Sequence, residues 1–184
     1  MRIYKLILTL CFFAINSIGK AQTIEGYSFE KYNIEKHTIK GKAKINFKSN
    51  PTARMFRTRI TEGYKSSNID FAGYYITIIW GCGTGCISGA MVDIRDGKVY
   101  DLPLNEETAY YGCYSNYGTD EDDRVTYKEF SRLFITTICY EKEIENSKNN
   151  KQDKIFLINV WNEQKKKFEL VKTIKKTYTK ERKE

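Results

Sequence analysis

The segment Tyr74–Cys86, YYITIIWGCGTGC, decides the fold, because a long apolar run is followed by a glycine-rich loop that can form a tight turn. β-Branched and aromatic residues fill the run and predict a strand over residues 71–80, unbroken enough to lie inside a sheet and not at its edge. A second apolar stretch over residues 90–94 follows the loop. Because the connection is short, we expect the two strands to pair antiparallel.

Turn signals continue this pattern downstream. Residues 95–98, RDGK, contain the Asp-Gly pair that is typical of a tight hairpin, and residues 99–102 predict the returning strand. Further strands are predicted, in chain order, over residues 132–140, 155–161 and 167–174, with a solvated loop over 145–154.

One helix is predicted upstream of this region. Asn50 is a good N-cap, and Pro51 suits the first helical position because its missing N–H is not needed there. Gly63 is placed to end the helix at C′. Apolar side chains recur at helical spacing at Ala53, Phe56 and Ile60. We therefore expect a short amphipathic helix over residues 51–62.

The predicted fold class is mainly β. Residues 39–47 alternate apolar and polar side chains, which predicts a strand with one buried face and one solvent-exposed face. The strands form an antiparallel meander with one short helix near residues 51–62, arranged as a sandwich, an open barrel or a curved sheet. A single β-rich domain is expected over residues 22–174, followed by a basic, frayed tail over 175–184.

The N-terminus is typical of a secretory signal peptide. Arg2 and Lys5 precede an apolar run over residues 6–15, and Ala21 offers a small residue at the cleavage position. That run is too short to span a bilayer, which needs about 20 residues. We expect residues 1–21 to be removed, and the mature chain to be secreted or periplasmic without a transmembrane segment.

The charge balance excludes one class of partner. The chain has 31 basic and 23 acidic residues, a net charge of +8, and the predicted signal peptide carries three of the basic residues. The mature chain is therefore only mildly basic. A dedicated nucleic-acid binder usually has a concentrated basic face, so no nucleic-acid partner is expected.

Four cysteines remain after the predicted cleavage. An even number of cysteines in an exported chain favours disulfide bonds, and four allow three connectivities. The most economical pairing joins Cys82 to Cys86 and Cys113 to Cys139. A bond from Cys82 or Cys86 to Cys113 is the alternative.

Chemical functions for the glycine–cysteine loop find little support. A four-thiolate zinc site needs reduced thiols, and a nucleophilic cysteine needs a base, for which His37 is the only histidine. A phosphate-binding loop would open a helix, whereas a strand follows here. We interpret Gly81, Gly83 and Gly85 as residues of a stapled turn, and expect no metal, no cofactor and no identifiable catalytic residue.

A wider pattern resembles a group of small exported bacterial proteins of unassigned function. The pattern covers residues 52–140 and comprises FAGYY at residues 71–75, WGCG at 80–83 with Cys86, Gly89-Ala90, Asp93 and GKVY at 97–100. In that group a histidine often stands where this chain has Tyr74, so no imidazole chemistry is implied at that position. The resemblance implies export and a stable fold, and no activity.

The irregular segment YYGCYSNYG is the predicted partner-binding surface. Tyrosines among Gly, Ser and Asn form an adaptable contact surface, here from Tyr110, Tyr111, Tyr114 and Tyr117. The acidic run over residues 120–123 lacks the glycine and oxygen-ligand spacing of a calcium loop. We expect an exported binding module, such as an inhibitor or immunity-type protein with a protein partner. The alternative is an envelope enzyme that acts on polysaccharide or peptide through carboxylates.

Overall fold

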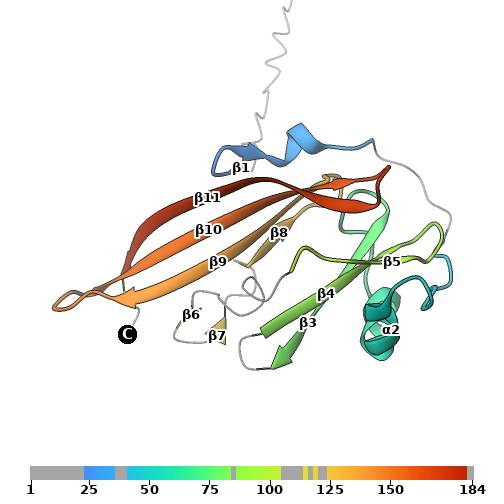
Figure 1. Ribbon diagram of the computed structural model, residues 1–184, viewed down its shortest axis with the longest axis horizontal. Helices are drawn as coiled ribbons and strands as arrows, with labels where there is room; N and C mark the ends of the chain where they lie inside the picture. Colours follow the sequence, from blue (N-terminus) through green and yellow to red (C-terminus); the bar gives the residue numbers. More distant parts are fainter. Residues whose placement is uncertain are drawn as a thin grey trace, which may run out of the picture.

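The protein consists of open antiparallel sheets with two short helices at one end (Figure 1). The computed structural model describes residues 23–35, 41–83, 86–104, 114–115, 118–119 and 124–181, and for 114–115 and 118–119 the backbone alone. The predicted fold class, mainly β and antiparallel, is confirmed. The two larger sheets are separate and open, do not close into a barrel, and share one buried aromatic cluster.

The first sheet contains the segment that decides the fold. Its strands are β3 (Tyr75–Gly83), β4 (Cys86–Asp93) and β5 (Val99–Asp101), in the order β3-β4-β5. Both predicted hairpins are confirmed, and Gly97 adopts φ 71° in the second turn, a conformation that favours glycine.

The predicted strand over residues 71–80 is confirmed from Tyr75 onward, but its predicted start and its predicted interior position are wrong. Residues 71–74 form a turn in which Ala72 and Gly73 have positive φ, and β3 lies at the edge of its sheet. The edge is protected locally, because Asp70 Oδ1 accepts a hydrogen bond of 2.8 Å from Thr77 N.

The second sheet is longer and carries the C-terminal half. Its order is β11-β10-β9-β8, with β8 (Val125–Tyr127), β9 (Leu133–Glu143), β10 (Asn149–Asn162) and β11 (Lys167–Glu181). The predicted loop over 145–154 is wrong from Asn149 onward, and the predicted frayed tail is wrong for residues 175–181. Both segments are strands because they pair with each other, Asn149 facing Glu181 and Ile155 facing Lys175. β9 also pairs with this part of β10, Asn150 facing Glu143. Apolar sequence patterns do not reveal these strand ends because their side chains are mostly polar.

The predicted helix is two helices, α1 (Pro51–Met55) and α2 (Arg57–Ser66). Asn50 caps α1 as expected, accepting a hydrogen bond of 2.6 Å from Thr52 N. The axis breaks at Phe56, and the prediction that Gly63 ends the helix is wrong. Gly63 lies inside α2, where a Cβ would stand 2.7 Å from Ile78 Cγ2, so glycine is required by close packing on β3.

Residues 41–47 do not form the predicted strand, and residues 39–40 lie outside the described part of the chain. The segment follows the turn between β4 and β5, held by hydrogen bonds from Ala43 N to Ile94 O and from Asn46 N to Gly97 O. The predicted alternation of buried and exposed side chains is nevertheless present. Ile45 and Phe47 pack on the core beside the helices, and Lys44 and Asn46 are exposed.

The core consists of three clusters. They lie between successive layers of the structure, which are the helices, the first sheet, the second sheet and the N-terminal arm. The first lies between the helices and the first sheet, around Ile60, Ile76 and Trp80. The second joins the two sheets through aromatic rings, and the third lies between the second sheet and the N-terminal arm, which comprises β1 (Thr23–Ile24), β2 (Tyr27–Ser28) and the 3-10 helix η1 (Phe29–Tyr32). In the second part, edge-to-face contacts join Tyr75 to Trp161 and Phe71 to Phe134.

We predict that Gly63→Ala destabilises the protein by about 1–2 kcal/mol, because the added methyl group overlaps Ile78. The sign is diagnostic, since alanine at an unconstrained helical site would stabilise by up to about 1 kcal/mol. Urea unfolding followed by circular dichroism measures the change. Thr58→Ala, at an exposed position of the same helix, is the control and should change stability by less than about 0.5 kcal/mol. Stabilisation by Gly63→Ala would contradict the packing of α2 on β3.

Candidate functional site

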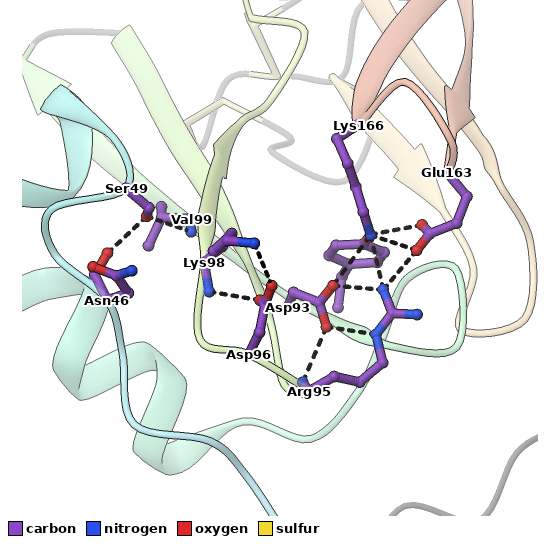
Figure 2. A network of polar contacts seen from close by, with 10 residues as sticks. Asn46, Ser49, Asp93, Arg95, Asp96, Lys98, Val99, Glu163 and Lys166 are labelled. Atoms are coloured by element: carbon purple, nitrogen blue, oxygen red, sulfur yellow. Dashed lines mark hydrogen bonds and ion pairs between the residues drawn. The ribbon is translucent and has the colours of Figure 1, made fainter.

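Two turns bring four charged side chains together where the sheets meet (Figure 2). Asp93 ends β4 and Arg95 lies in the turn that follows, while Glu163 and Lys166 lie in the turn between β10 and β11. We call these four residues the charge cluster. The signs alternate around it, so each carboxylate faces two cations.

The contacts within the charge cluster are short. Arg95 Nη2 lies 2.5 Å from Asp93 Oδ2 and 2.6 Å from Glu163 Oε1. Lys166 Nζ lies 2.5 Å from Glu163 Oε1 and 3.4 Å from Asp93 Oδ2. Asp93 is buried with 2% of its side chain exposed, whereas the other three are about one third exposed. The guanidinium of Arg95 also covers the ring of Tyr74 at 3.9 Å.

Buried aromatic residues complete the hydrogen bonding of Glu163. Tyr75 OH donates to Glu163 Oε2 at 2.6 Å, and Trp161 Nε1 donates to the same oxygen at 2.7 Å. Burial opposes ionisation of Glu163, but hydrogen bonds from Lys166, Tyr75, Arg95 and Trp161 outweigh it and lower its pKa to about 2. Burial and the Glu163 acceptor raise the pKa of Tyr75. Tyr75 therefore remains a neutral hydrogen-bond donor near neutral pH.

This arrangement is suited to holding the sheets together. Its carboxylates and cations are mutually paired, and Tyr75 has no exposed surface. A buried charge that is paired and hydrogen-bonded avoids most of the desolvation penalty. The charge cluster therefore fixes the distance between two turns that lie about 70 residues apart in the sequence.

The glycine–cysteine loop is the stapled tip of the β3–β4 hairpin. Cys82 and Cys86 form a disulfide with a Cα–Cα distance of 5.1 Å, as predicted. Gly83 has φ 140°, Gly81 is exposed, and Gly85 lies outside the described residues. Since both sulfurs are bonded, neither is a thiolate that could ligate zinc or attack a substrate. Cys139 is also disulfide-bonded, and its predicted partner Cys113 lies outside the described residues.

A hollow of about 400 Å³ lies between this hairpin and β8. One wall comes from Ile79, Trp80, Gly81 and Ile87, and the other from Val125, Thr126 and Tyr127. Its volume is within the range of small-ligand and side-chain pockets, about 300–1,000 Å³. The lining combines apolar side chains with hydroxyl groups, and the disulfide stiffens the hairpin that forms one side.

Asp70 is a carboxyl group with an unusual environment near this hollow. Burial raises its pKa from 3.8 to about 6, although the hydrogen bond from Thr77 N partly opposes the shift. Asp70 also interacts with Tyr127, one of the residues that line the hollow, and burial together with Asp70 raises the pKa of Tyr127 to about 12. Asp70 itself does not line the hollow among the described residues.

The structure describes little of the predicted tyrosine-rich surface. Tyr114 lies in β6 (Tyr114–Ser115), which pairs with β7 (Gly118–Thr119), so this part of the segment is a small hairpin. The other predicted residues lie outside the described part of the chain: Tyr110, Tyr111, Tyr117, His37 and the acidic run 120–123.

Sequence reasoning missed the charge cluster completely. From the sequence, Arg95 is placed in a predicted turn and Asp93 in the pattern over residues 52–140, and no role is assigned to Glu163 or Lys166. No local signal identifies them, because alternating charges are common in exposed turns. Asp70 carried a weak signal, as an acid directly before the apolar run.

No family model, no curated protein and no solved structure matches the chain. Within the described ranges, no group of three or more His, Cys, Asp or Glu side chains is placed to hold a metal ion. None of the helices formed by the described residues has the length and apolar character needed to cross a membrane.

We predict that Glu163→Gln destabilises the protein at pH 7 by roughly 1–2 kcal/mol, a value reduced because the side chain is partly exposed. The lowered pKa of Glu163 means that its contribution is present above about pH 4.5 and is lost as the pH falls toward 2. Denaturant unfolding of both proteins across this range should show their stabilities converging at acid pH. Glu169→Gln, which removes an exposed ion pair with Lys165, is the control and should have little effect. A constant difference between wild type and Glu163→Gln at every pH would contradict the charge assignment.

A second prediction concerns Asp70, whose raised pKa has the opposite consequence. The folded state binds this proton more tightly than the unfolded state, so the resulting stability is complete below about pH 4 and is lost as the pH rises through 6. Asp70→Asn keeps an acceptor for Thr77 N and should abolish this decline, about 2–3 kcal/mol in the wild type. Unfolding measured between pH 3.5 and 7.5 tests it, with the exposed Asp101→Asn as control. A decline that persists in Asp70→Asn would refute the assignment.

Proposed function

We propose that this protein is an exported binding protein that docks a protein partner through its tyrosine-rich segment and the hollow beside the cysteine hairpin. The main structural support for this proposal is the hollow between the cysteine hairpin and β8. It is a preformed concave site, large enough for one or two side chains, and its walls are Ile79, Ile87, Val125 and Tyr127 together with backbone of the hairpin. Anchor side chains of protein partners insert into pockets of this kind.

Chain connectivity keeps the tyrosine-rich segment close to the hollow. β7 ends at Thr119, and β8, which forms one wall of the hollow, begins at Val125. Six residues span at most about 20 Å, so the two parts can contact one partner at once. Tyrosines supply large contact areas at a low cost in conformational entropy, and the hollow supplies a place for an anchor.

The disulfide chemistry supports an extracellular or periplasmic setting. Cys82 and Cys86 are bonded to each other, and Cys139 is disulfide-bonded as well. Such bonds form and persist mainly in oxidising compartments, where a signal peptide would direct the chain.

The competing hypothesis, an envelope enzyme, has one supporting feature. Asp70 has the raised pKa that a general acid needs. Its Oδ1 atom, however, accepts a hydrogen bond from Thr77 N, and Asp70 is absent from the described lining of the hollow. Asp93 and Glu163 are occupied by Arg95 and Lys166. A binding role therefore fits the described residues better than hydrolysis.

We expect that immobilised wild-type protein captures one stoichiometric protein from native envelope extract, and that Gly81→Leu abolishes this capture. A Cβ added at residue 81 would meet only Cys86 O, at 3.9 Å. Because Gly81 lines the hollow, we expect leucine to be accommodated there and to fill part of it. Capture is quantified by gel densitometry and mass spectrometry.

The second variant pair addresses the tyrosines. Tyr111→Ala with Tyr114→Ala should also abolish capture, whereas Tyr178→Ala, an exposed tyrosine on β11, should leave it unchanged. Near-UV circular dichroism establishes that every variant is folded. Undiminished capture by both the Gly81→Leu and the double tyrosine variants would refute the proposed docking surface.

A further inference from the structure

Positive charge is dense in two short parts of this chain, residues 41–66 and the C-terminal residues 165–184. Residues 41–66 contain seven basic side chains and a single acidic one, Glu62, which is a net +6 of the total +8. The predicted signal peptide holds three further basic residues. Residues 165–184 contain nine basic and three acidic side chains, which is also a net +6, and the rest of the mature chain is net acidic. These two regions therefore set the positive part of the electric field of the molecule.

The fold gathers these residues at one end of the molecule. The segment before α1 lies beside α2, seen at the lower right of Figure 1. Tyr64 OH, on α2, donates a hydrogen bond of 2.9 Å to Ala43 O, and the guanidinium of Arg57 covers the ring of Phe47 at 4.5 Å. The segment and both helices therefore bring these charges to the same end of the molecule.

Six of the seven basic side chains are available to a ligand. Lys42 is the exception, because its Nζ donates to Tyr64 O at 2.7 Å and to Ser67 O at 2.5 Å. The other six are exposed, and none forms an ion pair with a described residue. We call these six the basic face: Lys44, Lys48, Arg54, Arg57, Arg59 and Lys65.

This surface differs from the other lysine-rich region. On β11 and its surroundings acidic side chains are interspersed, and Lys176, for example, forms an ion pair with Glu25 at 3.0 Å. Mixed charges of that kind are typical of an ordinary solvated surface. Glu62 is the single acidic side chain within residues 41–66, and Asp101 approaches the same region from β5, where its Oδ2 accepts a hydrogen bond of 3.1 Å from Asn50 Nδ2. Neither carboxylate forms an ion pair with a described basic residue of this region, and the cations outnumber the acids.

An exposed apolar side chain is next in sequence to one residue of the basic face. Met55, at the end of α1 and next to Arg54, is 73% exposed, the largest exposed fraction among the large hydrophobic residues of the described chain. The guanidinium of Arg57 covers the ring of Phe47, and a guanidinium can bind phosphate oxygens through two N–H groups at once. Cations around a protruding apolar side chain match a phospholipid surface, which offers phosphates above and acyl chains below.

We propose that the basic face binds the surface of an anionic phospholipid bilayer, with Met55 inserted between the headgroups. Each lysine or arginine near such a surface strengthens binding roughly five-fold. The attraction acts over about one Debye length, near 8–10 Å at physiological salt, so it depends on ionic strength. This inference stands apart from the proposed docking of a protein partner, since it uses none of the same residues.

Vesicle co-sedimentation tests the inference directly. The protein is purified as residues 22–184, which contain every described element of the fold and exclude the predicted signal peptide. It should sediment with vesicles of phosphatidylcholine containing 30% phosphatidylglycerol and remain in solution with phosphatidylcholine alone. Raising the salt concentration from 50 to 300 mM should release most of the bound protein.

Two variants and one charge-matched control locate the binding surface. Replacing Arg54, Arg57 and Arg59 by Gln should weaken binding about 100-fold. Replacing Lys172, Lys175 and Lys180 on β11 by Gln removes the same charge and should weaken binding less than about three-fold. Met55→Gln should weaken vesicle binding roughly five-fold without changing retention on heparin, a soluble polyanion.

Three outcomes would overturn the inference. Equal losses in the arginine and β11 variants would indicate a general charge effect. Vesicle binding that is insensitive to Met55→Gln, with heparin competing at low concentration, would indicate a soluble anionic polymer as the ligand. Binding of the wild type to neutral vesicles as tight as to anionic ones would exclude electrostatic recognition. Thermal unfolding of each variant confirms that the protein is folded.

Discussion

The contact between the two sheets is the constraint on which the structure depends. It buries Tyr75 and Trp161 against each other, and both carry a polar atom that needs a hydrogen-bond partner when water is excluded. Glu163 accepts from both, and this carboxylate is in turn held ionised by Arg95 and Lys166. The aromatic packing and the charge cluster are therefore one unit. Neither would persist without the other, because an unpaired buried carboxylate or an orphaned phenol would each cost free energy.

The partly buried carboxyl group of Asp70 and the hollow both arise because the sheets are open and leave edge strands unpaired. β3 is an edge strand, and Asp70 protects it by accepting from Thr77 N, at the expense of a carboxyl group whose pKa is raised by burial. The same strand ends in the disulfide-closed hairpin, whose stiff tip stands apart from β8 and leaves the hollow between them. A closed barrel would have no such gap. The site proposed for partner binding is thus a consequence of two sheets that meet along part of their length.

The two proposed surfaces use different parts of the molecule. The basic face belongs to the segment before α1 and to the helices, which cover the first sheet on the side away from the second. The hollow and the tyrosine-rich segment belong to the region where β8 and the cysteine hairpin approach each other. Binding to a bilayer through the first surface would leave the second free for a protein partner. Under the two proposals together, one molecule can bind a bilayer and a protein partner at the same time.

The amino-acid sequence by itself determined the local elements that depend on nearby residues. The hairpin turns, the cap at Asn50, the Cys82–Cys86 bond and the alternation at Ile45 and Phe47 all arise from conformational preference or side-chain spacing over a few positions. Tertiary structure alone decided which residues meet over long separations. Gly63 ends no helix because it packs on Ile78, residues 175–181 are ordered because β10 pairs with them, and Arg95 meets Glu163 across 68 positions. Those outcomes depend on strand pairing and packing between distant segments, and no local pattern encodes which distant partner a residue will find.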